Sequence, residues 1–372
     1  MTMPRRILVL GASYGSLFAT KLLMAGHRVT LVCTAATAGL INREGTRVRF
    51  PLKGRDAPLE VASKALPGVL AAATPGEVDP GAFDLVVLGM QEAQYGAHGV
   101  RELMSRIAHA RKPCLAIMNM PPLPYLRRIP GIASETLEGC YADPAVWANF
   151  DPALVTLASP DPQAFRPAGE PKNVLQVGLP TNFKAARFED EGHTALLRGL
   201  EEDIERARLA IDDEADDEAD DEADGEAIEI PVKLKVHDSI FVPLAKWPML
   251  IAGNYRCIRA NHMIPIREAV HGDAERSREI YEWVATLCRR LGADAADLVP
   301  FEKYAKAAEG LAKPSSAARA LFGGAEHIER VDRLVGRIAR QLGLHSDTVD
   351  EIVELIDERV DLNRRFARRS AA

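Results

Sequence analysis

A lysine and a histidine four residues apart are the first side chains in this sequence that could carry out chemistry. We expect a helix over about 231–252, on which Lys233, His237 and Phe241 share one face. A lysine held at a helix start beside a substrate can donate a hydrogen bond to a carbonyl oxygen and then give it a proton. The alternative is that Lys233 only offsets the acidic residues before it, and the residues alone leave both open.

Two further groups stand later in the chain. Lys313-Pro-Ser315-Ser316 precedes an expected helix over 316–321, where serine hydroxyls and unpaired N–H groups form an anion site of carboxylate size. The alternative there is an ordinary helix cap. The last group is Glu326, His327 and Glu329, at the start of an expected helix over 325–342. Capping or solvated carboxylates are the more common outcome for such residues.

The residues at 7–33 predict the element that must position this chemistry. A short apolar strand, a turn from Gly11 to Gly15, a helix ending at Gly26 and a second strand form a βαβ unit. The turn brings backbone N–H groups to a helix N-terminus, where a pyrophosphate is stabilised. We therefore expect a dinucleotide. The residues predicted to bind it here are Gly11, Ala12, Ser13, Tyr14, Gly15 and Ser16.

This glycine loop departs from the usual G-x-G-x-x-G pattern. Serine stands at positions 13 and 16, and Gly15 comes one residue early. Residues 11–15 also match the G-x-S-x-G nucleophile elbow of hydrolases, with Ser13 as the nucleophile. An elbow needs several strands before it, whereas this turn follows the first strand. The dinucleotide loop is therefore the leading interpretation, and a turn without function is a third.

Strands and helices alternate through the first half of the chain and give way to helices alone. Strands are expected at 47–50, 84–88, 114–118, 153–158 and 173–179, with helices over 40–45, 92–110 and 192–208. Helices follow over 272–291, 297–311 and 346–366, besides those already named. This order predicts an α/β fold, a Rossmann-type and mostly parallel sheet followed by an all-α domain. Asn119 ends the strand at 114–118, at the sheet edge where such folds bind ligands.

A run of acidic residues marks the boundary between the part with strands and the part with helices alone. Eleven acidic residues and no basic one stand at 212–226, and without them the net charge of −7 becomes about +4. Such a run repels itself and buries nothing, so we expect a solvated, disordered insert and no metal site. The predicted domains are 1–210 for the dinucleotide, 211–227 for the insert and 228–372 for substrate and catalysis.

Composition narrows the class of protein. No apolar run approaches the roughly 18–20 residues that cross a membrane. Five widely spaced cysteines without a C-x-x-C pair are typical of a reducing compartment, so we expect a cytoplasmic protein with neither membrane nor nucleic acid as partner.

The order of these motifs resembles the ketopantoate reductases (2-dehydropantoate 2-reductases) over nearly the whole chain. The matching stretches are 7–32, Ile41-Asn-Arg-Glu-Gly-Thr-Arg-Val48, the strand ending in Asn119, Lys233-Leu-x-Val with Pro243-Leu244, Pro314-Ser-Ser316, and Gly343-Leu with Thr348-Val. The resemblance implies reduction of a 2-oxo acid, by default 2-dehydropantoate in pantothenate synthesis, by hydride transfer from NADP.

The resemblance also implies roles for single residues. Lys233 corresponds to the family's general acid and Asn119 to its cofactor-side asparagine. Ser315 or Ser316 corresponds to the serine that binds the substrate carboxylate. Glu329, with Glu326 behind it, corresponds to the family's catalytic glutamate.

Three positions depart from the family pattern. Gln91, in the expected cofactor site, stands where the family usually has a lysine. His237 and Phe241, the expected substrate contacts, stand where asparagines usually follow the catalytic lysine by four and eight residues. The substrate therefore need not be 2-dehydropantoate, and a dinucleotide-binding protein without catalysis is an alternative function.

Cofactor choice depends on the end of the second strand, at Cys33-Thr34. No carboxylate stands there to repel a 2′-phosphate, and Thr34, Thr37 or Arg43 could reach one, so we expect NADP rather than NAD. A small-molecule 2-oxo acid is the expected partner, and a homodimer is left open.

Overall fold

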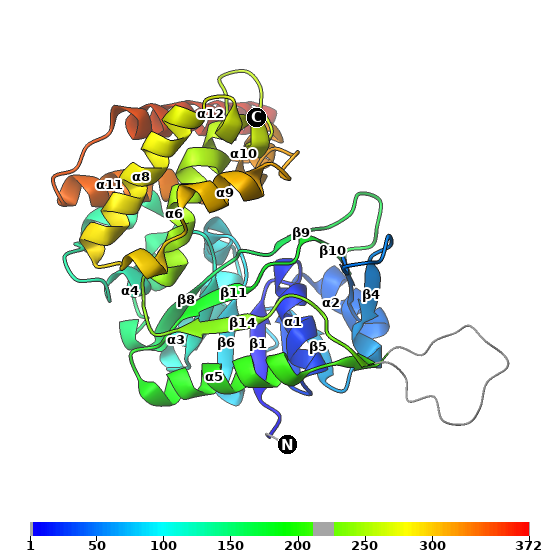
Figure 1. The fold of residues 1–372 in the computed structure, drawn as a ribbon. Coiled ribbons are helices and arrows are strands. Elements are labelled where there is room, and N and C mark those ends of the chain that lie inside the picture. Colours follow the sequence, from blue (N-terminus) through cyan, green and yellow to red (C-terminus); the bar gives the residue numbers. More distant parts are fainter. Residues whose placement is uncertain (1–2, 211–226, 372) are drawn as a thin grey trace.

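An eight-stranded sheet forms the first part of the molecule (Figure 1). The computed structural model describes residues 3–210 and 227–371. The first six strands of the sheet are parallel, as expected for an α/β fold. The order is β5 (Val69–Ala73), β2 (Arg28–Val32), β1 (Arg6–Leu10), β6 (Leu85–Leu88), β7 (Cys114–Ile117), β8 (Val155–Ser159), β11 (Phe183–Ala186) and β14 (Leu234–His237).

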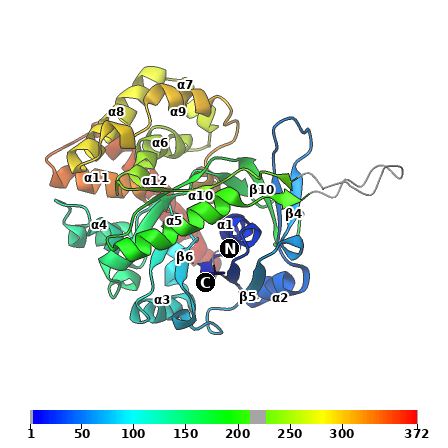
Figure 2. The same ribbon diagram turned by 60° about the horizontal axis from the view of Figure 1, so that its bottom comes forward.

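The central strands are buried on both faces, and β1 shows how each face is covered. Ile7 and Val9 pack into one apolar core, and Leu8 and Leu10 pack into a second core on the opposite face. The first core includes α1 and α5, which lie side by side (Figures 1 and 2). The helices beside the sheet are α1 (Tyr14–Met24), α2 (Ala35–Glu44), α3 (Val100–His109), α4 (Leu123–Leu126) and α5 (Glu191–Arg206).

The helix expected over 231–252 is wrong in its first part, because Leu234–His237 form β14. Leu234 and Val236 are buried, and the residues that alternate with them are partly exposed. This period of two fits a strand, and β14 pairs in parallel with β11, which itself runs antiparallel to β8. The α/β region therefore extends past residue 228 into the segment that we expected to be wholly helical.

A second, smaller sheet lies over the α1–α2 side of the first. Its order is β4 (Leu59–Ala62), β3 (Arg47–Phe50), β10 (Val174–Leu179) and β9 (Gln163–Phe165). The segment from β9 to β10 runs from the end of β8 toward α1 and α2 (Figure 1). Two short strands, β12 (Leu209–Ala210) and β13 (Ala227–Ile228), pair at the two ends of the acidic segment.

The rest of the chain is helical, as expected. Helical turns run from Val242 to Cys257 and include α6 (Lys246–Met249). The later helices are α7 (Ile266–His271), α8 (Ala274–Leu291), α9 (Phe301–Ala308), α10 (Ser316–Phe322), α11 (Val331–Gln341) and α12 (Asp347–Ala371). The helix expected over 325–342 starts only at Val331, so Glu326, His327 and Glu329 precede it.

The second core joins the helical region to the sheet. It contains Leu8 and Leu157 from the sheet together with Leu244 and Trp247 from the helical turns. No helix among the described residues is long and apolar enough to cross a membrane. The predicted acidic insert falls almost wholly on residues 211–226, which lie outside the described residues.

Candidate active site

The glycine loop lies between β1 and α1, where the sequence placed it. Gly11 has a φ of +101°, and a Cβ on it would lie 2.7 Å from Met90 Cγ. Gly15 packs α1 against β1, because a Cβ there would lie 2.7 Å from Val9 Cγ1. Gly15 therefore does the packing work of the third glycine in the usual pattern, one residue early.

The other loop residues hold the turn in shape. Ser13 is the N-cap residue of α1, and the Ser16 hydroxyl donates to the Ala12 carbonyl at 2.7 Å. The Tyr14 hydroxyl donates to the Pro162 carbonyl at 2.6 Å, which ties the loop to the chain after β8. Ser13 has a φ of −91°, and its hydroxyl has no hydrogen-bond partner within residues 3–210 and 227–371, so nothing there forms the triad that a hydrolase elbow needs.

The residues predicted near the ends of the neighbouring strands β2 and β6 differ in their exposure and in their hydrogen bonds. Thr34 caps α2 at the end of β2, and its hydroxyl donates to the Thr37 hydroxyl at 3.0 Å. Gln91 is exposed after β6, and its backbone N–H donates to Gln94 Oε1 at 3.0 Å. Arg43 is nine residues further along α2 than Thr34, and its exposed side chain pairs with Glu44.

Asn119 and Glu329 meet although 210 residues separate them. Asn119 follows β7, and its Nδ2 donates to Glu329 Oε2 at 3.2 Å. The sequence named both residues, and the structure brings them together where the helical region covers the carboxyl end of β7.

Burial raises the pKa of Glu329 to about 7, with the nearby Glu92 adding to the shift and Asn119 opposing it. Burial also raises the pKa of Glu92 to about 7, against hydrogen bonds from the Ala142 and Asp143 backbone. Glu92 was missed by the sequence analysis, because nothing in its neighbours marks it as buried. Two carboxyl groups that titrate near neutrality therefore lie at the ends of β6 and β7.

Lys246 is the second residue that the sequence analysis missed. It opens α6, and its Nζ lies 3.1 Å from Asp161 Oδ1 just after β8. Lys184 shares the same carboxylate, with its Nζ 3.4 Å from Asp161 Oδ2. A signal was present in the sequence, because Asn254 follows Lys246 by eight residues, one of the two asparagine spacings named above.

These residues occupy neighbouring strand ends. The strands β8, β7, β6 and β1 are adjacent and parallel, and their carboxyl ends carry Asp161, Asn119, Glu92 and Gly11 in that order. We call these four residues, with Lys246, Lys184 and Glu329, the carboxyl-edge site. Open α/β sheets bind their ligands at this edge.

Lys233 lies elsewhere, and its expected place at a helix start is wrong. It immediately precedes the edge strand β14, and its ammonium is held by Glu205 and Glu229. These carboxylates raise the pKa of Lys233 against the effect of burial. We call Lys233, Lys235, Glu201, Glu205 and Glu229 the edge-strand cluster.

His237 ends β14, near Lys184 of the carboxyl-edge site, and Phe241 follows it by four residues. His237 lies about 13 Å along the extended chain from Lys233, so the two share no helix face. Burial and the nearby Lys184 lower the pKa of His237. The Phe241 ring packs on Gly292, where a Cβ would lie 2.9 Å from its Cζ.

Ser315 forms an ordinary helix cap at the start of α10, the alternative to the predicted anion site that the sequence left open. Its hydroxyl accepts from Ala318 N at 3.1 Å and donates to the Asn254 carbonyl at 2.7 Å. Ser315 is buried, whereas Ser316 is exposed. Ser315 therefore links α10 to the helical turns that carry Lys246.

Arg166 is a third residue that the sequence analysis missed. It follows β9, and its Nη2 lies 3.4 Å from the Ala12 carbonyl of the glycine loop. Partial burial lowers the pKa of its guanidinium, and the nearby Cys33 thiol opposes that shift. Within the described parts of the chain it forms no ion pair with a carboxylate. Its position between the glycine loop and the end of β2 fits a phosphate of a dinucleotide.

Comparison with known proteins gives matches in structure alone. No protein-family model matches the chain, and no curated protein matches it in sequence. D-mandelate dehydrogenase in complex with NADH and anilino(oxo)acetate is 14% identical, with a TM-score of 0.62 over 96% of this chain and 99% of that one. A PanE/ApbA-family ketopantoate reductase from Ralstonia eutropha JMP134 is 16% identical, with a TM-score of 0.61 over 96% and 99%.

A dimeric ketopantoate reductase from Staphylococcus aureus is 11% identical, with a TM-score of 0.61 over 96% of this chain and 99% of that one. At these identities the matches establish architecture, and the near-complete coverage includes both the sheet and the helical region. The chain therefore has the fold of the ketopantoate reductases and of D-mandelate dehydrogenase, as the resemblance in sequence predicted.

Proposed function

We propose that this protein reduces a 2-oxo acid with NADPH, and that Lys246 is its general acid. The observation that carries the proposal is the position of Lys246. Its ammonium group lies against Asp161 at the end of β8, on the same sheet edge as the glycine loop. Lys233, which the sequence favoured, is held by two carboxylates in the edge-strand cluster.

The residues of the carboxyl-edge site divide the work of the reaction. The nicotinamide ring, when bound, supplies the hydride that adds to the carbonyl carbon of the substrate. The Lys246 ammonium donates a hydrogen bond to the carbonyl oxygen and gives it a proton, and Asp161 holds that ammonium in place. Two lysines facing one carboxylate leave positive charge for the substrate's own carboxylate.

Asn119 and Glu329 complete the site from the neighbouring strand. Asn119 fixes the Glu329 carboxyl, and near pH 7 that carboxyl is present partly in its protonated form. A protonated carboxyl can donate a hydrogen bond to an anionic substrate without repelling it. Glu329 is therefore proposed as the substrate-orienting group.

For the cofactor, the proposal remains NADP. No acidic residue follows β2, and Arg166 adds an unpaired guanidinium close to the end of that strand. Thr34 lies at the same strand end. An arginine and a hydroxyl there favour a 2′-phosphate over a bare ribose.

For the substrate, 2-dehydropantoate is the first candidate and a more apolar 2-oxo acid is the second. The second is favoured by Leu250, which is buried four residues after Lys246, where the family pattern has an asparagine. An aliphatic side chain cannot hydrogen-bond a substrate hydroxyl, so a hydrophobic or aromatic group would fit there. The D-mandelate dehydrogenase structure was solved with an aromatic oxo acid, anilino(oxo)acetate.

One assay tests the proposal. NADPH and NADH consumption would be followed with 2-dehydropantoate, phenylglyoxylate and a series of aliphatic 2-oxo acids, using the wild type and Lys246→Met. We expect NADPH oxidation with at least one acid, and its loss in the variant. Tight NADPH binding without oxidation of any acid would favour a binding protein without catalysis, and labelling of Ser13 by a fluorophosphonate would favour a hydrolase.

The proposal also includes the oligomeric state of the protein. The Staphylococcus aureus ketopantoate reductase is described as dimeric, so we propose a homodimer for this chain as well. Light scattering on the purified protein would give a mass near twice 40.5 kDa if the proposal holds.

A further inference from the structure

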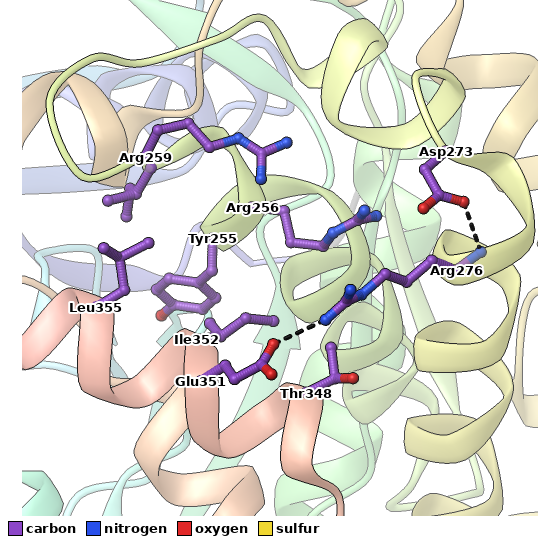
Figure 3. A pocket seen from close by; sticks show the side chains of 10 residues that line it. Tyr255, Arg256, Arg259, Asp273, Arg276, Thr348, Glu351, Ile352 and Leu355 are labelled. Atoms are coloured by element: carbon purple, nitrogen blue, oxygen red, sulfur yellow. Dashed lines mark hydrogen bonds and ion pairs between the residues drawn. The ribbon is translucent and has the colours of Figure 1, made fainter.

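A cavity of about 360 Å³ lies within the helical region, apart from the carboxyl-edge site. Its walls come from the segment at 255–259, the start of α8 and the first turns of α12 (Figure 3). None of its lining residues belongs to the sheet or to the glycine loop. The size falls in the usual range for small-molecule pockets. The lining residues are Tyr255, Arg256, Ile258, Arg259, Asp273, Arg276, Thr348, Glu351, Ile352 and Leu355.

The charged wall of this cavity is short of negative charge. Three arginines line it, and only Arg276 has an ion-pair partner there, Glu351 at 2.7 Å. The Asp273 carboxylate accepts from the Arg276 backbone N–H at 3.0 Å, which places it at the N-terminus of α8.

Arg256 is the buried member of the three. Its Nη1 donates to Ser277 Oγ and to the Ala252 carbonyl, both uncharged acceptors. Burial and the nearby Arg259 and Arg276 lower its pKa, and the Asp273 carboxylate opposes that shift. Three guanidinium groups and two carboxylates line the cavity, so a bound anion would offset the repulsion among the arginines that the two carboxylates leave.

Arg259 supplies the accessible donor. It is exposed, and within the described residues its guanidinium has no hydrogen-bond or ion-pair partner. Figure 3 shows its side chain reaching toward Arg256 across the mouth of the cavity. Planar guanidinium groups recognise carboxylates and phosphates by paired hydrogen bonds.

Another part of the cavity wall is apolar. Tyr255, Ile352 and Leu355 lie together beside the arginines (Figure 3). We propose that this cavity binds a small organic anion, whose carboxylate or phosphate head contacts Arg256 and Arg259 and whose apolar body packs on Tyr255, Ile352 and Leu355.

The cavity is joined to the carboxyl-edge site by one side chain. The Tyr255 hydroxyl donates to the Glu329 carbonyl at 2.6 Å and accepts from Val331 N at 3.0 Å. A ligand on the Tyr255 ring would therefore touch the residue that holds the backbone of Glu329. Binding is the proposal, and an effect on turnover is a secondary readout that depends on the proposed function.

Titration calorimetry on the full chain tests the proposal with phenyl phosphate and benzoate as probes, and with benzyl alcohol as a neutral control. Each titration is repeated in saturating NADPH, so that binding at the nucleotide site is recognised. We expect one of the two anions to bind saturably in the presence of NADPH, and the alcohol not to bind. The stronger of the two probes identifies the head group as phosphate or carboxylate.

Three variants locate the site. Arg259→Gln should weaken the bound anion about tenfold or more, because it removes charge-assisted hydrogen bonds from an exposed side chain. Leu355→Trp should block the cavity, and Arg290→Gln, at the far end of α8, should leave binding unchanged. The proposal is overturned if neither anion binds, if NADPH displaces the probe, or if Arg259→Gln binds as the wild type does.

Discussion

The edge-strand cluster and the carboxyl-edge site both contain partly buried lysines beside carboxylates, yet the lysines of the two sites differ in how many carboxylate partners they have. In the edge-strand cluster Lys233 and Lys235 face three glutamates, and Lys233 touches two of them. In the carboxyl-edge site Lys246 and Lys184 share the single carboxylate of Asp161. Each lysine of the first pair has two carboxylate partners, whereas the two lysines of the second pair share one carboxylate.

We propose that this difference separates a structural ion pair from a binding site. A lysine whose donors are already taken by two carboxylates gains nothing from an anionic substrate. A lysine that shares one carboxylate retains donors for a ligand, and it lies where the sheet already presents the glycine loop. Charge that the protein does not itself neutralise is therefore the better guide to function here.

The most direct test of this comparison replaces Lys246 and Lys233 in turn, and it should give the largest effect. Lys246→Met should lower turnover by about 10²–10⁴-fold, because it removes the proposed general acid. Lys233→Met should leave turnover nearly unchanged and cost about 1 kcal/mol of stability or less, as expected for a partly exposed ion pair. Steady-state kinetics and thermal melts on both variants measure this. A larger loss of turnover in Lys233→Met than in Lys246→Met would reverse the assignment.

Arg166 extends the comparison to the cofactor. Arg166→Gln should raise the KM for NADPH about tenfold while changing that for NADH little, since a charge-assisted hydrogen bond to a phosphate is lost. Arg49→Gln, a change to an arginine already paired with Glu60 and Glu170, is the matched control. Equal effects on the two cofactors would mean that Arg166 does not read the 2′-phosphate.

The next prediction concerns Glu329 and the pH dependence of stability. Its folded-state pKa of about 7 lies above the ordinary value of 4.5, so the folded protein favours the protonated form. The stability that this preference contributes is full below about pH 4.5 and is lost as the pH rises to about 7. Glu329→Gln stays neutral, so its melting temperature should rise relative to the wild type between pH 5 and pH 8. Glu326→Gln, an exposed neighbour, should follow the wild type, and a constant offset for Glu329→Gln would argue against the raised pKa.

The smallest effect is expected from the acidic segment. The strands β12 and β13 pair with each other, so the residues that flank 211–226 already lie next to one another. Replacing 212–226 by a short Gly-Ser turn should leave melting temperature and turnover nearly unchanged. A large loss in either measurement would show that the acidic residues act on the folded enzyme.

The strands and helices could be predicted from the sequence where the apolar pattern of an element directly reflects which of its residues are buried. The apolar runs of β1, β6 and β7 are buried on both faces and read as strands without ambiguity. The same holds for α5 and α12, whose apolar positions recur at helical spacing. Asn119 could be named because it ends such a strand.

The misplacement of Lys233 has a physical cause. Leu234-Lys-Val-His237 alternates apolar and polar residues, which is a strand signal, but the long helical texture that follows suggested a helix from 231 onward. The helical turns begin at Val242, so the expected helix started about eleven residues too early. Lys246, the proposed general acid, lies within these turns, one short element after Lys233.

The contacts of Glu92 and Arg166 could not be predicted in the same way. Both depend on long-range packing: Glu92 is buried against the chain at 142, and Arg166 reaches the glycine loop from β9. No local spacing encodes such contacts. Glu329 was named by resemblance, although the start of its helix was misjudged by six residues.

The apolar core that runs from β1 and β8 into Leu244 and Trp247 governs how this protein denatures. Because the helical region and one face of the sheet bury the same side chains, neither can melt without exposing the other to water. Heating should therefore produce one cooperative transition, and a fragment that starts at Val242 would aggregate through its uncovered Trp247 surface instead of folding alone.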